Sequence, residues 1–212
     1  HPFGRYLVNR YECLEVLSRH VGDALVIHTG GGTGHEWDSL HPGPASLDAP
    51  VGGVAGLALG LAKALPQCSV IGLDTDGGLL MNLGVLTDIG NLQPPNLTII
   101  AFDNEVYEST GAQPSASSGN TDFAAMARGA GVEKAVAVRT LEAFEKSLVE
   151  ALKGLACDFI VAKTEIGAKK VPSLDMSGVE MKFQFVRHIE KITGVKVLTP
   201  PEQQIPSHLV KE

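Results

Sequence analysis

Residues 69–114 read SVIGLDTDGGLLMNLGVLTDIGNLQPPNLTIIAFDNEVYESTGAQP, and this stretch decides the fold. Two continuous apolar runs, at 69–75 and 97–103, are typical of strands that are covered on both faces. The segment between them, at 78–91, has the apolar spacing of a helix. A strand, a helix and a second buried strand in this order predict one unit of a parallel sheet.

The rest of the chain continues this alternation. Further strands are predicted at 24–28, 132–138 and 159–164, and helices at 9–20, 51–65, 121–128, 141–155 and 179–193. The Gly- and Pro-rich segment 30–50 and the polar segment 104–120 are predicted to be loops. We therefore expect an α/β fold, a doubly wound and mostly parallel sheet flanked by helices. One domain is expected over residues 1–195, followed by a surface tail at 196–212.

Composition limits the possible functions. The chain has 212 residues, 44% of them hydrophobic and 19% charged, as in an ordinary globular domain. No apolar run approaches the ~20 residues of a membrane-spanning helix. The net charge of −7 argues against a broad nucleic-acid-binding surface. Three widely separated cysteines argue against an iron–sulfur or zinc site and indicate a reducing, cytoplasmic location: Cys13, Cys68 and Cys157.

Asp76 and Asn104 each come directly after a buried strand. Adjacent parallel strands end at the same edge of a sheet, so both side chains are expected at that edge, where such folds bind ligands. Their oxygens suit a hard divalent cation, and Gly77 and Gly78 open a helix whose bare amides suit an anion. The combination predicts a metal–diphosphate site. For Asp76 alone, a simple helix N-cap is an equally good interpretation.

The segments DTDGGLLMN (74–82) and FDNEVYESTGAQP (102–114) resemble the thiamine-diphosphate motif, in which GDG is followed by NN after one helix and one strand. The resemblance is to the thiamine-diphosphate-dependent decarboxylases, in particular to the beta subunit of sulfopyruvate decarboxylase and the matching half of phosphonopyruvate decarboxylase. It covers residues 10–167 and implies the diphosphate-binding (PP-type) half of the thiamine-diphosphate-binding fold. It also implies thiamine diphosphate and Mg2+ as cofactors and a small 2-oxo acid as substrate.

The resemblance implies roles for single residues as well. The implied Mg2+ ligands are Asp76, Asn104 and the backbone carbonyl of Val106. The implied contacts with the cofactor and the mouth of the site are Val51 beneath the thiazolium ring, Gly77 and Gly78 at the diphosphate, Asn104, Tyr107, Ser109, Thr110, Gly111 and Gln113.

The chain departs from the family pattern at four places. Thr75 replaces the first glycine of GDG, and Gly78 replaces the serine that is usually found at its position. Asp103 replaces the first asparagine of NN. Residues 34–36 (GHE) stand where decarboxylase relatives have serine–arginine–glutamate, and the missing arginine would be a bidentate partner for an anionic substrate group.

The segment GGGTGHE at 30–36 allows other interpretations. It fits neither the dinucleotide fingerprint nor a P-loop. The spacing of His35 and His41 in a Gly- and Pro-rich stretch argues against a helix and against zinc. We predict a flexible active-site loop in which His35 is a candidate acid–base group or substrate contact. A surface histidine explains His35 equally well.

The chain has room for only half of such an enzyme, because both halves together need about 350 residues. In the family, the glutamate that activates the cofactor belongs to the other, pyrimidine-binding half. We therefore expect a heteromer whose partner is a pyrimidine-binding-domain subunit, with the helix at 51–65 as a candidate interface. The alternatives are the beta subunit of another 2-oxo-acid-processing enzyme (a ferredoxin oxidoreductase or a ligating synthase) and a non-catalytic cofactor-binding module.

Overall fold

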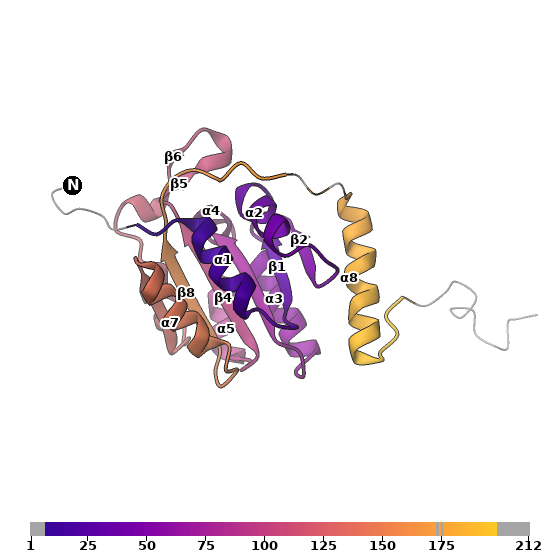
Figure 1. The fold of residues 1–212 in the computed structure, drawn as a ribbon. Coiled ribbons are helices and arrows are strands. Elements are labelled where there is room, and N and C mark those ends of the chain that lie inside the picture. The colour runs from indigo at the N-terminus through magenta and orange to yellow at the C-terminus, as the bar shows by residue number, and fades with distance from the viewer. Residues whose placement is uncertain (1–6, 173, 175, 199–212) are drawn as a thin grey trace, which may run out of the picture.

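The computed structural model describes residues 7–172, 174 and 176–198, and its centre is a six-stranded sheet (Figure 1). All neighbouring strands are parallel, in the order β2-β1-β3-β4-β8-β7. The strands are β1 (Leu25–Thr29), β2 (Ser46–Ala49), β3 (Val70–Thr75), β4 (Leu97–Asp103), β7 (Lys134–Val138) and β8 (Asp158–Lys163). The chain runs outward from β1 to β2 and then crosses to β3 on the other side of β1. The winding therefore reverses between β1 and β3, where open α/β sheets bind ligands.

Helices cover both faces of the sheet, so the predicted fold class is confirmed. One face carries the helices that stand in front of the sheet in Figure 1: α1 (Arg10–His20), α2 (Gly32–Leu40) and α7 (Leu141–Ala151). The other face carries α3 (Val54–Ala64), α4 (Asp76–Met81), α5 (Val85–Leu92) and α6 (Phe123–Gly129). Successive strand residues alternate between two core clusters: Leu25 and Ile27 pack with α3, whereas Val26 packs with α1. The last helix, α8 (Gly178–Thr193), packs along the edge strand β2.

Most helices begin where the sequence places a capping side chain. In five of the eight α-helices of the described residues, the side chain before the first turn accepts a hydrogen bond from a backbone amide, which satisfies one of the free donors at a helix start. These residues are Asn9, Thr75, Asp122, Thr140 and Ser177.

The segment 30–50 is not the predicted loop, because it contains α2 and β2. The prediction that no helix forms here was wrong. Two glycines cost about 2 kcal/mol of helix propensity, but Trp37 of α2 is fully buried and its Nε1 donates to Ser46 Oγ of β2 at 2.9 Å. Burial of a hydrogen-bonded indole offsets the poor propensity of this segment.

Two predicted helices have different bounds. The helix predicted at 78–91 is two helices, α4 and α5, separated by a turn at 82–84. In that turn, Asn82 Nδ2 donates to the carbonyl of Gly52 at 3.3 Å. The helix predicted at 51–65 begins only at Val54, because Gly52 adopts a left-handed conformation (φ +83°) in a turn that precedes it.

The polar segment after β4 forms a compact excursion at the top of Figure 1. It holds a two-stranded antiparallel ribbon and two short 3-10 turns: β5 (Val106–Tyr107), η1 (Glu108–Thr110), β6 (Gln113–Pro114) and η2 (Ala116–Ser118). Residues 199–212 of the predicted tail lie outside the described residues, and the predicted domain bounds stay a prediction. Among the helices of the described part, none has the length and apolar character needed to cross a membrane.

Candidate functional site

A cavity of about 510 Å³ lies at the carboxyl ends of β1, β3 and β4. Most of the residues singled out in the sequence line it together, although they come from three separate segments. They are Val51, Asp76, Gly77, Gly78, Asn104, Val106, Tyr107, Ser109 and Thr110. The cavity therefore lies at the reversal of winding, where the sheet topology predicts a ligand.

Three residues of the sequence prediction do not line this cavity. His35 lies on the exposed side of α2, and Gly111 and Gln113 are exposed near the β5–β6 ribbon. The catalytic role of His35 stays a prediction.

The pairing of β3 with β4 brings the two strand ends together. Thr75 lies opposite Phe102 in the parallel register, so Asp76 and Asn104 both emerge at the same edge of the sheet. The expectation that both side chains lie at one edge is confirmed. The interpretation of Asp76 as the helix N-cap is wrong, because the N-cap of α4 is Thr75, whose Oγ1 accepts from the Gly78 amide at 3.1 Å.

The Asp76 carboxylate is buried and held by two serines. Its Oδ2 accepts from Ser115 Oγ at 2.6 Å and lies 3.4 Å from Ser117 Oγ. Ser117 in turn donates to Asp103 Oδ1 at 2.6 Å. Burial raises the pKa of the Asp76 carboxyl, the hydrogen bond from Ser115 acts in the opposite direction, and the nearby Asp103 charge raises the pKa further. A cation would relieve this concentration of negative charge.

The Asn104 side chain is held at both ends. Its Nδ2 donates to Glu108 Oε2 at 2.7 Å, and its Oδ1 accepts from the Val106 amide at 3.1 Å. A carbonyl oxygen has two lone pairs, so Oδ1 retains one for a further partner.

A side chain would not fit at Gly78 without a shift of Asp74, and it would crowd Tyr107 at Gly77. A Cβ at Gly77 would lie 3.1 Å from the ring of Tyr107, and a Cβ at Gly78 would lie 2.1 Å from Asp74 Oδ1. The backbone therefore borders the cavity directly at these two positions.

Several lining residues were missed in the sequence. Residues 29–33, from the end of β1 to the start of α2, line the cavity, and the sequence predicts an active-site segment here but none of these contacts. Arg10 of α1 also lines the cavity; it is buried, and its Nε donates to Glu36 Oε2 at 2.8 Å. Its Nη1 lies 3.4 Å from Glu108 Oε2, and Glu108 lines the cavity too. No local pattern marks Arg10, because only the tertiary fold brings it to the site.

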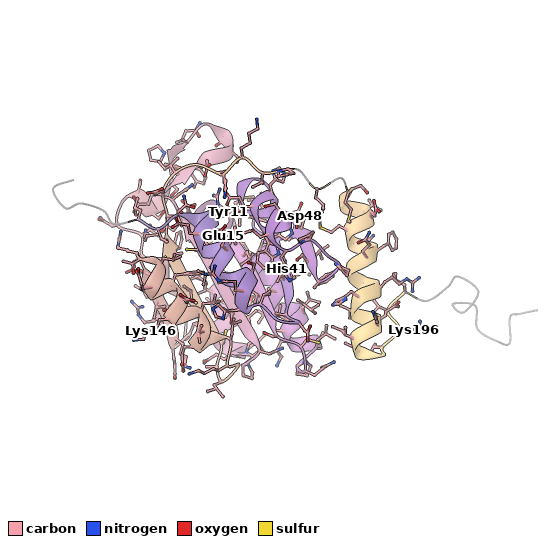
Figure 2. The ribbon with its side chains drawn as sticks, in the orientation of Figure 1. Tyr11, Glu15, His41, Asp48, Lys146 and Lys196 are labelled. Carbon is pink, nitrogen blue, oxygen red and sulfur yellow. The ribbon has the colours of Figure 1, made fainter. Side chains whose placement is uncertain are left out.

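A second cavity of about 480 Å³ adjoins the first beside α1. Tyr11 and Glu15, which are labelled on α1 in Figure 2, line it, and Arg10 and Ala168 line both cavities. The Lys169 ammonium lies 3.7 Å from the centre of the Tyr11 ring, a cation–π contact that helps hold the segment after β8.

The donor set of the first cavity fits Mg2+ better than a transition metal. It offers a carboxylate, an amide oxygen and a backbone carbonyl, all hard oxygen ligands. Within residues 7–172, 174 and 176–198, no group of three or more His, Cys, Asp or Glu side chains could hold a metal ion. A cation bound here would need oxygens from a phosphate group and water, which is the usual coordination of Mg2+.

Comparison with known proteins decides the family. Residues 45–161 match the family described as thiamine pyrophosphate enzyme, C-terminal TPP binding domain. The chain belongs to this family. The resemblance of the sequence to thiamine-diphosphate-dependent enzymes is thereby confirmed. The motif residues of this thiamine pyrophosphate enzyme domain line the cavity at the ends of β1, β3 and β4.

Relatives of the domain include named decarboxylases. The chain is 37% identical over 142 residues to the sulfopyruvate decarboxylase subunit beta of Methanocaldococcus jannaschii, covering 66% of this chain and 75% of that relative. It is 33% identical over 132 residues to the phosphonopyruvate decarboxylase of Streptomyces viridochromogenes, covering 61% of this chain but only 33% of the relative.

A solved structure supports the fold. Benzoylformate decarboxylase from Polynucleobacter necessarius superposes with a TM-score of 0.64 at 17% identity, over 81% of this chain and 36% of that chain. The thiamine pyrophosphate enzyme domain therefore spans about a third of these two longer proteins.

Proposed function

We propose that this chain is the thiamine-diphosphate- and Mg2+-binding subunit of a 2-oxo-acid decarboxylase, completed by a separate pyrimidine-binding subunit. The observation that carries the proposal is the meeting of the motif residues from three segments in one cavity. The similarity to named decarboxylases supports this class of reaction.

The residues of the cavity have distinct roles in this proposal. Asp76, Asn104 and the carbonyl of Val106 hold the cation, and the backbone at Gly77 and Gly78 receives the diphosphate. Val51 supports the thiazolium ring, and three residues of the β5–η1 segment border the mouth: Tyr107, Ser109 and Thr110. Bound thiamine diphosphate supplies the electron sink for loss of carbon dioxide.

A partner subunit follows from the size of the relatives. The chain covers most of a relative that is named as a subunit, but only a third of a relative that is a single longer chain. Apolar side chains are also exposed on and just before α3, at Leu57 and Val51, and no atom of the described residues lies within 4 Å of a Cβ built at Gly60. These features support a heteromer in which the missing glutamate comes from the partner. A cytoplasmic location and an acid–base or substrate-contacting role for His35 belong to the same proposal.

Calorimetric titration of the purified chain with thiamine diphosphate tests the cofactor site. Binding is expected with Mg2+ and not with EDTA. The variant Asp76→Ala is expected to abolish binding and to leave the circular dichroism spectrum unchanged, whereas Asp88→Ala, an exposed acid on α5, is expected to bind like the wild type. Normal binding by Asp76→Ala would overturn the metal assignment.

Activity tests the split site. The chain alone, with thiamine diphosphate and Mg2+, is expected not to decarboxylate 2-oxo acids, and activity is expected only with the pyrimidine-binding subunit added. Decarboxylation by the chain alone would show that no partner glutamate is required. Lack of any Mg2+-dependent binding would favour a non-catalytic module instead.

A further inference from the structure

Two residues to which the thiamine-diphosphate motif gives no role hydrogen-bond directly to the proposed side-chain ligands. Ser115 Oγ donates to Oδ2 of Asp76 at 2.6 Å. Glu108 Oε2 accepts from Nδ2 of Asn104 at 2.7 Å. Ser115 and Glu108 thus each hold one terminal atom of a ligand, and the other terminal atom, Oδ1 in both cases, retains a lone pair for a cation.

Glu108 decides which way the Asn104 amide faces. An ionised carboxylate only accepts hydrogen bonds, so the atom that faces Glu108 must be the NH2 group of Asn104. The opposite atom is then the oxygen, as its hydrogen bond from the Val106 amide at 3.1 Å requires. Without Glu108 only the hydrogen bond from the Val106 amide would hold this orientation, and a flipped side chain would present its NH2 group, which repels a cation.

Ser115 fixes the Asp76 carboxylate in a comparable way. Ser115 is buried, and its hydroxyl lies 2.9 Å from that of Ser117, which donates to Asp103 at 2.6 Å. Asp103 is paired with Lys163 of β8 at 2.5 Å. A chain of buried polar groups therefore connects the carboxylate to a strand of the central sheet, and such a chain limits its rotation.

We infer that Ser115 and Glu108 are positioning residues of the cation site, each of which orients one ligand so that its free oxygen faces the cation. The inference rests on the proposed function, because it assigns the support of that same site. Groups behind a metal ligand typically change metal affinity by 10- to 100-fold when they are removed.

The test measures thiamine diphosphate binding to the full chain by calorimetry, once with Mg2+ and once with Ca2+. Ser115→Ala and Glu108→Ala are each expected to weaken binding with Mg2+ by about 10- to 100-fold. The loss with Ca2+ is expected to be at least several-fold smaller, because Ca2+ tolerates flexible ligand geometry and Mg2+ demands a nearly ideal octahedron. A residue that merely supports the fold would weaken binding with both cations equally.

Conservative variants separate orientation from charge and from folding. Glu108→Gln keeps an acceptor for Asn104 without the negative charge, so it is expected to keep most of the affinity that Glu108→Ala loses. Ser118→Ala is the matched serine control, because Ser118 Oγ donates to the Ser115 backbone carbonyl at 2.7 Å and, among the described residues, makes no hydrogen bond with Asp76 or Asn104. Urea unfolding without cofactor measures the stability of each variant independently.

The outcomes distinguish the inference from the proposed function. If the wild type binds with Mg2+ and both alanine variants bind equally well, or lose affinity equally with both cations, the positioning roles are wrong and the cofactor site stands. If the wild type shows no Mg2+-dependent binding, the proposed function is wrong and the positioning roles are overturned with it.

Discussion

Replacing Lys163 by methionine removes the charge that balances two buried acids beside the site. The Lys163 ammonium lies 2.5 Å from Asp103 Oδ2 and 3.3 Å from Glu105 Oε1, and all three residues are buried. Methionine has a similar length and no charge, so Lys163→Met leaves Asp103 in the interior without its ammonium partner. Breaking a buried ion pair in this way typically costs 3–5 kcal/mol.

That cost is large relative to the total stability. Domains of ordinary size unfold with about 5–15 kcal/mol, and about 1 kcal/mol shifts the melting temperature by 2–4 °C at this chain length. Lys163→Met is therefore expected to lower the melting temperature by about 6–20 °C. The midpoint of urea unfolding is expected to fall in parallel without a change of slope.

The double variant Asp103→Asn/Lys163→Met provides the decisive comparison. The thiamine-diphosphate motif has asparagine at position 103, and an amide oxygen still accepts from Ser117 and from the Glu105 amide, as Asp103 Oδ1 does now. The double variant is expected to recover at least about 2 kcal/mol of the loss, measured as a coupling energy in a double-mutant cycle. A double variant no more stable than Lys163→Met, or a single variant within 1 kcal/mol of the wild type by unfolding, would refute the charge-balance reasoning.

Three further predictions concern the packing, the thiols and the end of α8. Gly90→Ala is expected to lower the free energy of unfolding in urea by at least about 2 kcal/mol, because its Cβ would lie 1.9 Å from the backbone carbonyl oxygen of Ala130. Gly60→Ala on α3 is the control; its Cβ would meet no atom of the described residues within 4 Å, so it is expected to raise the free energy of unfolding by about 0.5–1 kcal/mol. Burial raises the pKa of the Cys68 thiol, and the other two cysteines are more deeply buried, so a thiol reagent at pH 8 is expected to label at most Cys68 until urea is added. Glu190 of α8 accepts hydrogen bonds from the Leu198 amide and from Arg187, which lower its pKa from 4.5 to about 2. The carboxylate is therefore expected to stabilise the end of α8 fully at pH 7 and to lose this effect as the pH falls from about 4.5 toward 2. Hydrogen exchange measures this loss, and unchanged protection of the Val197 and Leu198 amides at pH 2 would contradict it.

Local periodicity was enough to predict the strands that are buried on both faces. The apolar runs that form β3 and β4 contain few polar residues, and parallel strands of this kind have no other stable environment. The same reasoning failed for α2 and β2. Their residues have poor propensity, and α2 is stabilised by Trp37, which finds its partner only when β2 is in place.

The residues of the site also fall into a group that the sequence predicts and a group that it does not. Asp76 and Asn104 were predictable, because each follows a strand that the sequence marks clearly, and adjacent strands bring their ends together. Arg10 and Lys163 were not predictable as neighbours of the site. They come from α1 and β8, far away in the sequence, and only the tertiary contacts place them there.

Two of the four departures from the family pattern, Thr75 and Asp103, are each matched by a partner in the structure. Thr75, in place of a glycine, adopts an extended conformation that any residue tolerates and caps α4 through Gly78. Asp103, in place of an asparagine, is neutralised by Lys163 and hydrogen-bonded by Ser117. An apolar pair at positions 103 and 163 would be equally stable or more so, so stability alone does not account for the buried ion pair. The compensated departures therefore favour a working cofactor subunit over a degenerate binding module.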